Sequence, residues 1–280
     1  MLQDWKTRTG QHLRAVGLVV GAAGVGLLAA SPAVATTSLA GQRCGGTLIS
    51  AISTPQSAVE EVAIDTTSST ASPTLGALYS ATTKAVIDRA VSEGAALRVV
   101  DLGASGVGAR IVFQGSFAAL GDDELFNLAA TNRMRCQAIE SLAYFAGSNA
   151  VKRGVGSDVA GTVANLIAHA KSVMSDKARA TITIATDGCE APARSGLNRR
   201  LTDLCGKLAA GETGSSILSA HKDEFTLPDA SGVTVVMRGV GVGRRPDAAS
   251  TRLAATLVDF WMTVCRRAHA AACLIGSDLP

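Results

Sequence analysis

Three short polar segments of this sequence carry side chains that could bind a hard metal ion. They are Asp65-Thr66-Thr67-Ser68-Ser69, Gly156-Ser157-Asp158 and Thr186-Asp187-Gly188. Their carboxylates and hydroxyls supply oxygen ligands, and Mg²⁺ prefers such ligands in near-octahedral geometry at about 2.1 Å while it keeps some of its waters. Hydroxyls that coordinate directly, with carboxylates behind them holding the waters, would leave the ion electrophilic. An acidic group of a partner could then complete the shell.

The three segments lie where strands and helices are predicted to begin or end. Residues 58–64 (AVEEVAI) form a predicted strand that runs into Asp65, and the β-branched run 178–186 (ARATITIAT) is typical of a strand buried on both faces. A helix is predicted from Ser157 or Asp158 onward. Because ligands gather beyond the carboxyl ends of strands in open α/β sheets, we expect the three segments to meet at one edge of a sheet.

Strands and helices alternate along the rest of the chain. Apolar spacing predicts further strands at 96–102, 109–114 and 232–238, and helices at 75–93, 122–145, 157–174, 198–209 and 250–273. Such alternation is typical of an α/β fold with a mostly parallel central sheet and helices on both faces. With 280 residues, of which 47% are apolar, the chain can bury one substantial core without a second domain.

The order of these segments resembles the von Willebrand factor type A family. The metal ion-dependent adhesion site of that family combines a D-x-S-x-S loop, a Thr from a later loop and an Asp that follows a central strand. Here Asp65, Thr67 and Ser69 match the loop. Ser157, in GSDVAGTV, matches the Thr, and Asp187, in ITIATDG, matches the Asp. The resemblance implies a Rossmann-like three-layer sandwich that binds Mg²⁺ or Mn²⁺ through these five residues and has no catalytic activity.

The resemblance covers residues 58–267 and departs from the family pattern at three positions. Thr67 replaces a Ser and Ser157 replaces a Thr, so that both positions keep a hydroxyl oxygen, while Ser68 replaces the usual Gly. These changes affect the geometry and affinity of the site more than coordination itself. The implied function is that of an extracytoplasmic binding or adhesion module, which recognises an acidic group on a protein or glycan partner through the cation.

Each segment also has a simpler structural interpretation. Ser157 and Asp158 could only cap a helix, Asp187 and Gly188 could form an ordinary turn, and the loop at Asp65 could be an Asx-type turn without metal. The alternative function is therefore a metal-free structural or regulatory subunit of a cell-envelope complex, with a degenerate site. We do not expect an enzyme, because the G-x-S-x-G nucleophile motif is absent and the run GVGVG lacks the G-x-G-x-x-G spacing of a dinucleotide site.

The charge of the chain argues against partners that need a concentrated basic surface. Its formal net charge is +3, and its basic pairs are isolated from one another, at Arg199-Arg200, Arg244-Arg245 and Arg266-Arg267. Nucleic-acid binding is therefore not expected.

The first 35 residues have the pattern of a secretory signal peptide. A basic N-terminal region precedes the apolar stretch 16–30, and the small residues Ala33-Val34-Ala35 predict cleavage after Ala35. We expect a secreted or cell-envelope protein with an extended lead-in at 36–57 and the binding domain at 58–280. The chain would be attached to a membrane only if this N-terminal helix stayed uncleaved, and its apolar stretch is shorter than the ~20 residues that span a bilayer.

All six cysteines lie downstream of the predicted cleavage site, and an even number in an exported chain favours disulfides. Six cysteines allow fifteen pairings. No C-x-x-C pair indicates a zinc site. Local spacing favours two pairs, the second at the end of the last predicted helix, and leaves a third by elimination: Cys189–Cys205, Cys265–Cys273 and Cys44–Cys136.

Overall fold

A computed structural model describes most of the chain. The described residues all belong to one compact unit that spans Thr37–Pro280. The predicted signal peptide at 1–35 lies outside them. The described residues are Cys44, Ile52, 55–67, 73–102, 109–119, 121–149, 156–189, Leu201, 203–242 and 248–277.

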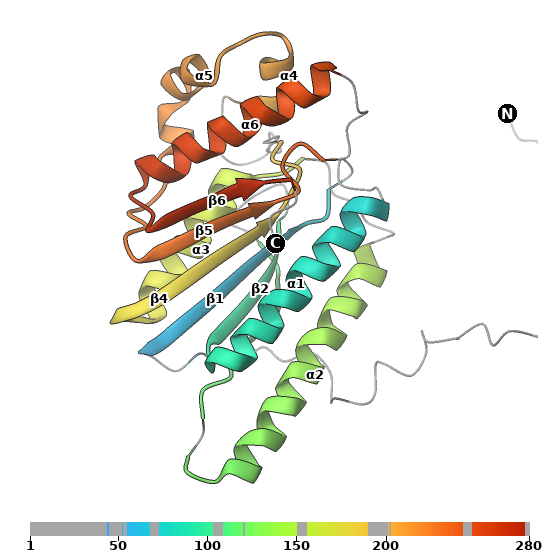
Figure 1. The fold of residues 1–280 in the computed structure, drawn as a ribbon, viewed down its shortest axis with the longest axis vertical. Coiled ribbons are helices and arrows are strands. Elements are labelled where there is room, and N and C mark those ends of the chain that lie inside the picture. Colours follow the sequence, from blue (N-terminus) through green and yellow to red (C-terminus); the bar gives the residue numbers. More distant parts are fainter. Residues whose placement is uncertain are drawn as a thin grey trace, which may run out of the picture. The chain divides into compact units, whose positions relative to one another are not determined.

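The strands form one six-stranded sheet in the order β3-β2-β1-β4-β5-β6. Neighbouring strands are parallel except β2 and β3, which are antiparallel. The predicted α/β fold with a mostly parallel sheet is therefore confirmed (Figure 1). The strands are β1 (Gln56–Asp65), β2 (Ala96–Leu102), β3 (Ile111–Ser116), β4 (Met174–Ala185), β5 (Val233–Arg238) and β6 (Ala272–Gly276).

The helices lie between the strands along the chain, as the alternating pattern predicts. Most of the predicted helices and strands are found within a few residues of their expected bounds. The helices are α1 (Pro73–Glu93), α2 (Glu124–Asn149), α3 (Val159–Val173), α4 (Leu204–Ala209), α5 (Gly214–Ala220), the 3₁₀ helix η4 (Lys222–Phe225) and α6 (Ala248–Arg267).

Two neighbouring glutamates of β1 show which helix lies on which face of the sheet. Glu60 accepts hydrogen bonds from Nε and Nη2 of Arg89 in α1 at 2.7 and 2.6 Å, whereas Glu61 pairs with His169 of α3. Because successive residues of a strand point to opposite faces, α1 and α3 lie on opposite sides of the sheet (Figure 1). These partners also explain how a buried strand can contain two acidic residues.

The larger apolar core lies on the α3 side of the sheet. Leu166 of α3, Ile182 of β4 and Trp261 of α6 belong to one buried cluster there. The Trp261 ring meets the rings of Phe225 and Phe260 edge to face, with centroids 6.0 and 5.5 Å apart. This aromatic cluster attaches α6 and the η4 segment to the same core.

The end of the chain differs from the helix predicted at 250–273. Helix α6 ends at Arg267, His269 has a left-handed backbone with φ of 58°, and the next residues form β6 beside β5. The short apolar run of β6 fits a helix and a strand alike, so that only its pairing with β5 decides between them. The disulfide between Cys265 and Cys273 therefore joins α6 to β6, not two turns of one helix.

The helix predicted at 198–209 is also shorter than expected. Leu201 and Asp203 precede it, and α4 begins where Asp203 Oδ1 accepts a hydrogen bond from the backbone N–H of Gly206 at 2.7 Å. An aspartate that caps the first turn sets the start of a helix, whatever apolar spacing precedes it. The remaining positions of that prediction, 198–200 and 202, lie outside the described residues.

Three disulfides are present. Two have the pairing that the spacing favours, and the third is the pair left by elimination: Cys189–Cys205, Cys265–Cys273 and Cys44–Cys136. Disulfides of this number are typical of proteins that fold in an oxidising, extracytoplasmic compartment. Within the described part of the chain, every helix is too short or too polar to cross a membrane.

Candidate metal site

Four of the five predicted metal ligands lie together at the carboxyl edge of the sheet. Asp65 ends β1, Asp187 follows β4, and Ser157 precedes α3. These residues and Thr67 are each at most 4% exposed. Ser69, the fifth predicted ligand, lies outside the described residues.

The Asp65 carboxylate is the centre of a hydrogen-bond network. Its Oδ1 accepts hydrogen bonds from the backbone N–H of Thr67 at 3.0 Å and from Thr67 Oγ1 at 2.7 Å. Its Oδ2 accepts from Thr186 Oγ1 at 2.8 Å and from Ser157 Oγ at 3.2 Å. Ser157 Oγ also lies 2.9 Å from Thr67 Oγ1. One carboxylate and three hydroxyls, from segments far apart in the sequence, therefore share one buried site.

Asp187 is held beside this network by the turn that follows β4. Its Oδ1 accepts a hydrogen bond from the backbone N–H of Cys189 at 2.9 Å, and its carbonyl oxygen accepts one from Gly241 N at 2.9 Å. The carbonyl of Gly188 accepts a hydrogen bond from Trp261 Nε1 at 2.9 Å. The core tryptophan and the disulfide of Cys189 thus fix the loop that presents the second carboxylate.

Burial dominates the electrostatics of the site. It raises the pKa of Asp65 from 3.8 to about 6; hydrogen bonds from Thr67 and Thr186 oppose this rise, and the negative charge of Asp187 adds to it. The pKa of Tyr79 is raised as well, by burial and then by the charges of the two aspartates. Tyr79 Oη is buried without a hydrogen-bond partner among the described residues. The site therefore concentrates negative charge where little water can screen it.

The residues fit a hard divalent cation. Carboxylates and hydroxyls are the oxygen donors that Mg²⁺ and Mn²⁺ prefer, and a divalent charge would relieve the repulsion between two buried carboxylates. Asp65, Thr67, Ser157 and Asp187 are the described residues that would hold the ion. Thr186 would act behind them, because its hydroxyl orients the Asp65 carboxylate.

The simpler interpretations apply to part of the site. Asp158 does cap α3, since its Oδ1 accepts a hydrogen bond from the backbone N–H of Gly161 at 2.9 Å. The bond from Thr67 N to Asp65 is also the one expected of an Asx turn. Ser157, by contrast, directs its hydroxyl to the carboxylate of Asp65 and so belongs to the network.

Two contacts at this edge were not part of the sequence prediction. Thr186, which precedes the predicted ligand Asp187, donates a hydrogen bond to Asp65. Asp101, near the end of β2, accepts a hydrogen bond from Thr66 Oγ1 at 2.6 Å, and burial raises the pKa of Asp101. Both residues could have been found by examining the carboxyl end of every predicted strand for polar side chains.

A second group of possible ligands, Cys44, Cys136 and Glu140, is not a metal site. Their ligand atoms lie within 4.8 Å of one another. The two sulfurs are joined in a disulfide, however, and metal binding by cysteine requires a thiolate.

We expect Gly188→Ala to destabilise the loop that carries Asp187. Gly188 has φ of +80°, and an added Cβ would lie 3.0 Å from Val240 Cγ1 and 3.3 Å from Trp261 Nε1. We predict a decrease of about 1–3 kcal/mol in the free energy of unfolding, measured by urea denaturation. Gly211→Ala is the matched control, because Gly211 has φ of +93° but nothing within 4 Å of its added Cβ. Equal losses in the two variants would show that the contacts with Val240 and Trp261 do not constrain the loop.

Comparison with known proteins assigns no family to the chain. No family model matches it, and no curated protein matches it significantly. Among solved structures, proximal thread matrix protein 1 from the mussel byssus is similar with a TM-score of 0.35 and 12% identity, over 78% of this chain and 48% of that chain. A second crystal form of that protein gives a TM-score of 0.32 and 13% identity, over 66% and 38% of the two chains. This chain thus spans less than half the length of either structure, and a likeness of this degree carries no functional argument.

Proposed function

We propose that the chain is an extracytoplasmic binding or adhesion module of the von Willebrand factor type A kind. It would recognise an acidic group on a protein or glycan partner through Mg²⁺ or Mn²⁺. The observation that carries this proposal is the meeting of Asp65, Thr67 and Ser157, whose side-chain oxygens lie 2.7–3.2 Å apart although Ser157 is 90 residues from Thr67 in the chain. The proposed ligands are Asp65, Thr67, Ser69, Ser157 and Asp187.

The donor set suits recognition of an acidic ligand better than catalysis. Thr67 and Ser157 would bind the cation through neutral hydroxyls, while Asp65 and Asp187 would hold its waters. Neutral direct ligands leave the cation most of its charge, and the cation would supply Lewis acidity for a carboxylate of the partner. No nucleophile–base pair is required for this function.

A second candidate is favoured by the completeness of the hydrogen-bond network. Asp65 already accepts bonds from Thr67, Thr186 and Ser157, so that the network closes without a cation. A metal-free structural or regulatory subunit of a cell-envelope complex would use the same residues to hold β1, β4 and the start of α3 together. The two candidates differ in one measurable property, which is the affinity for a divalent cation.

Calorimetric titration of the full oxidised chain with Mg²⁺ and Mn²⁺ distinguishes these candidates. We expect saturable binding to the parent and binding weaker by about 10- to 100-fold in Thr67→Val and Ser157→Ala, since each loses one oxygen ligand. Ser172→Ala is the matched control, because Ser172 is exposed on α3, the helix that Ser157 precedes, and bonds only locally to the His169 carbonyl. Identical heats in all four proteins would favour the metal-free subunit.

A further inference from the structure

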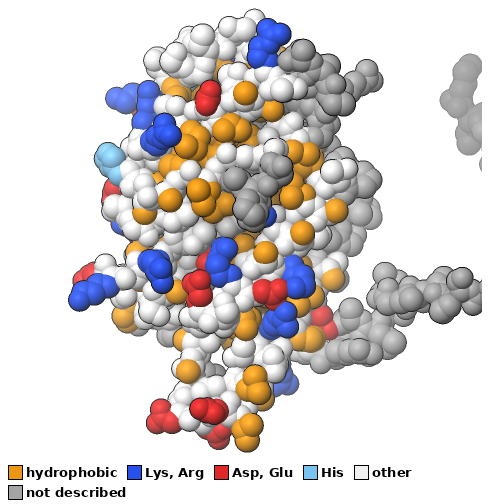
Figure 2. All heavy atoms as spheres, in the orientation of Figure 1, with side chains coloured by type: hydrophobic (Ala, Val, Ile, Leu, Met, Phe, Trp, Pro, Cys, Tyr) orange, Lys and Arg blue, Asp and Glu red, His pale blue; other side chains and the backbone are white. Residues whose placement is uncertain are grey.

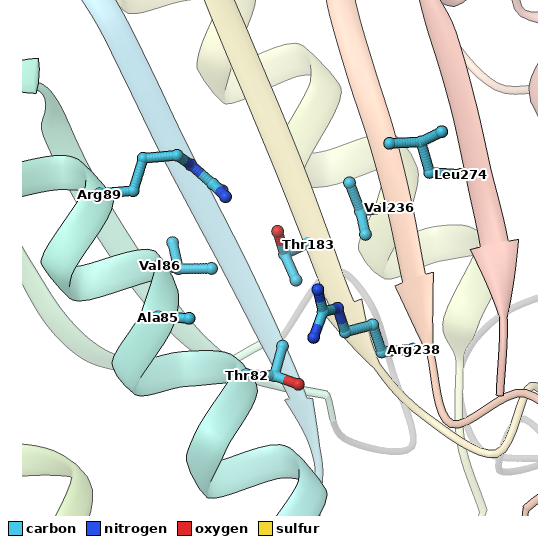
Figure 3. A pocket seen from close by; sticks show the side chains of 8 residues that line it. All are labelled: Thr82, Ala85, Val86, Arg89, Thr183, Val236, Arg238 and Leu274. Carbon is cyan, nitrogen blue, oxygen red and sulfur yellow. The ribbon is translucent and has the colours of Figure 1, made fainter. Parts of the chain in front are cut away.

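A pocket with a volume of about 230 Å³ lies on the α1 side of the sheet (Figure 3). One wall is the α1 helix from Thr82 to Arg89, and the floor is formed by β4, β5 and β6. No residue of the proposed metal site lines it. The pocket is therefore a separate feature of the fold.

The floor of the pocket is a row of aligned side chains on three neighbouring strands. Thr183 of β4 pairs in register with Val236 of β5, which pairs with Leu274 of β6. Leu274 is 49% exposed, whereas the next residue, Ile275, is buried in the core on the opposite face. Apolar side chains gather on this face of the molecule (Figure 2). The side of β5 and β6 that faces α1 thus offers an apolar surface.

One end of the pocket carries a cation without an opposite charge. Arg89 is engaged by both carboxylate oxygens of Glu60. The guanidinium of Arg238, which extends from β5 toward α1, makes no ion pair with any residue in the described part of the chain (Figure 3). Burial, and then the charge of Arg89, lower the pKa of Arg238, as expected for a cation that lacks a counter-charge.

A buried hydroxyl beside Arg238 also lacks a partner. Thr82 is 2% exposed, and its Oγ1 makes no hydrogen bond to any described residue. Thr82 and Arg238 lie next to each other at the same end of the pocket (Figure 3). Because Thr82 Oγ1 is closed off from solvent, the guanidinium of Arg238 is the group that a carboxylate would meet at this end of the pocket, and its geometry matches the two carboxylate oxygens.

We propose that this pocket binds a small organic carboxylate with a short apolar chain. The carboxylate would lie on Arg238, and the chain would extend over Val236 and Leu274. The volume suits such a ligand, because an apolar cavity of about 150 Å³ is large enough for benzene and this pocket is larger. Binding of such a ligand is separate from the function proposed for the metal site, and the two proposals can be tested independently.

Hexanoate is the probe for this proposal, and amide resonances of uniformly ¹⁵N-labelled full-length protein are the readout. We expect hexanoate to shift resonances of β5 and β6 saturably. Acetate has the charge without the chain, and hexylammonium has the chain with the opposite charge, so both should require about tenfold or higher concentrations. Two results would overturn the proposal without any variant. One is saturation by hexylammonium at the same concentration as hexanoate, and the other is that hexanoate leaves the β5 and β6 resonances unchanged.

A variant of Arg238 and a matched control test the assigned donor. Arg238→Met keeps most of the apolar stem and should weaken hexanoate binding by about tenfold or more, because it removes a charge-assisted hydrogen bond. Arg266→Met, at an exposed position on α6, is the matched control and should bind hexanoate like the parent. Unchanged affinity in Arg238→Met would remove Arg238 as the anion-binding residue.

Discussion

Asp65→Asn is expected to raise the free energy of unfolding at pH 7.5 in the presence of a chelator, and to remove any stabilisation by Mg²⁺. The first effect follows from burial, since the Asp65 carboxylate must be charged at this pH although its pKa in the folded protein is about 6. An asparagine keeps the acceptor for Thr67, and its amide can donate to the hydroxyls of Ser157 and Thr186. The gain can reach about 3 kcal/mol, because one pKa unit corresponds to about 1.36 kcal/mol.

The pH dependence has a definite sign. The pKa of Asp65 is higher in the folded chain than its ordinary value of 3.8, so that between pH 3.8 and about 6 the folded state binds more protons than the unfolded state. The contribution of Asp65 to the free energy of unfolding is therefore fully present below pH 3.8 and is lost as the pH rises through about 6. The advantage of Asp65→Asn over the parent should accordingly be largest above pH 6 and disappear toward pH 4, in urea denaturation at each pH.

The response to Mg²⁺ is the second measurement on the same two proteins. An ion at a concentration of 100 Kd that binds only the folded state stabilises it by about 2.7 kcal/mol, and the parent alone should show this gain. Asp176→Asn is the matched control, because Asp176 is exposed on β4, and it should respond to Mg²⁺ like the parent. A parent that gains nothing from Mg²⁺ while Asp65→Asn is still more stable would contradict the metal site and support the metal-free subunit.

Glu61→Ala is expected to lower the free energy of unfolding by about 3–5 kcal/mol, the range for removal of one partner from a buried charged pair. The Glu61 side chain is fully buried between His169 of α3 and Arg98 of β2, with Nη1 of Arg98 3.8 Å from its Oε2. The Arg98 side chain is only 10% exposed, and its Nε and Nη1 have no hydrogen-bond partner among the described residues. Without Glu61, the guanidinium charge would lose its nearest carboxylate in the core.

A double variant separates the loss of charge balance from the loss of packing. Glu61→Leu with Arg98→Met removes both charges and keeps apolar volume, and it should recover most of the stability that Glu61→Ala loses. Arg179→Met, at an exposed position of β4, is the control and should change stability by less than about 0.5 kcal/mol. If Glu61→Ala and the double variant lose equal stability in urea denaturation, unbalanced charge is not the cause.

The local spacing of apolar residues predicted many of the helices and strands. The strand predicted at 96–102 is β2 with the same bounds, and the helix predicted at 75–93 differs from α1 by two residues at its start. The β-branched run at 178–186 lies within β4 except for its last residue. These elements have apolar spacing that repeats over many residues, and the side chains that make the pattern are the ones that become buried.

The placement of the site could also be inferred from sequence, because parallel strands end at the same edge. Asp65 ends β1 and Asp187 follows β4, and because these strands are neighbours in the sheet, Thr186 lies at the Asp65 carboxylate. The role of Asp101 was not predicted, since its relation to Thr66 depends on β2 lying beside β1.

Neighbouring residues alone predict the period of each long element and place polar side chains at the strand ends, because both features are local in the chain. Three features could be known only from the folded chain: the last apolar run is strand β6, Glu61 contacts His169 and Arg98, and Arg238 and Thr82 line the same pocket. Each of these depends on contacts between segments distant in the chain. Such contacts follow from the order and register of strands, which local periodicity does not encode.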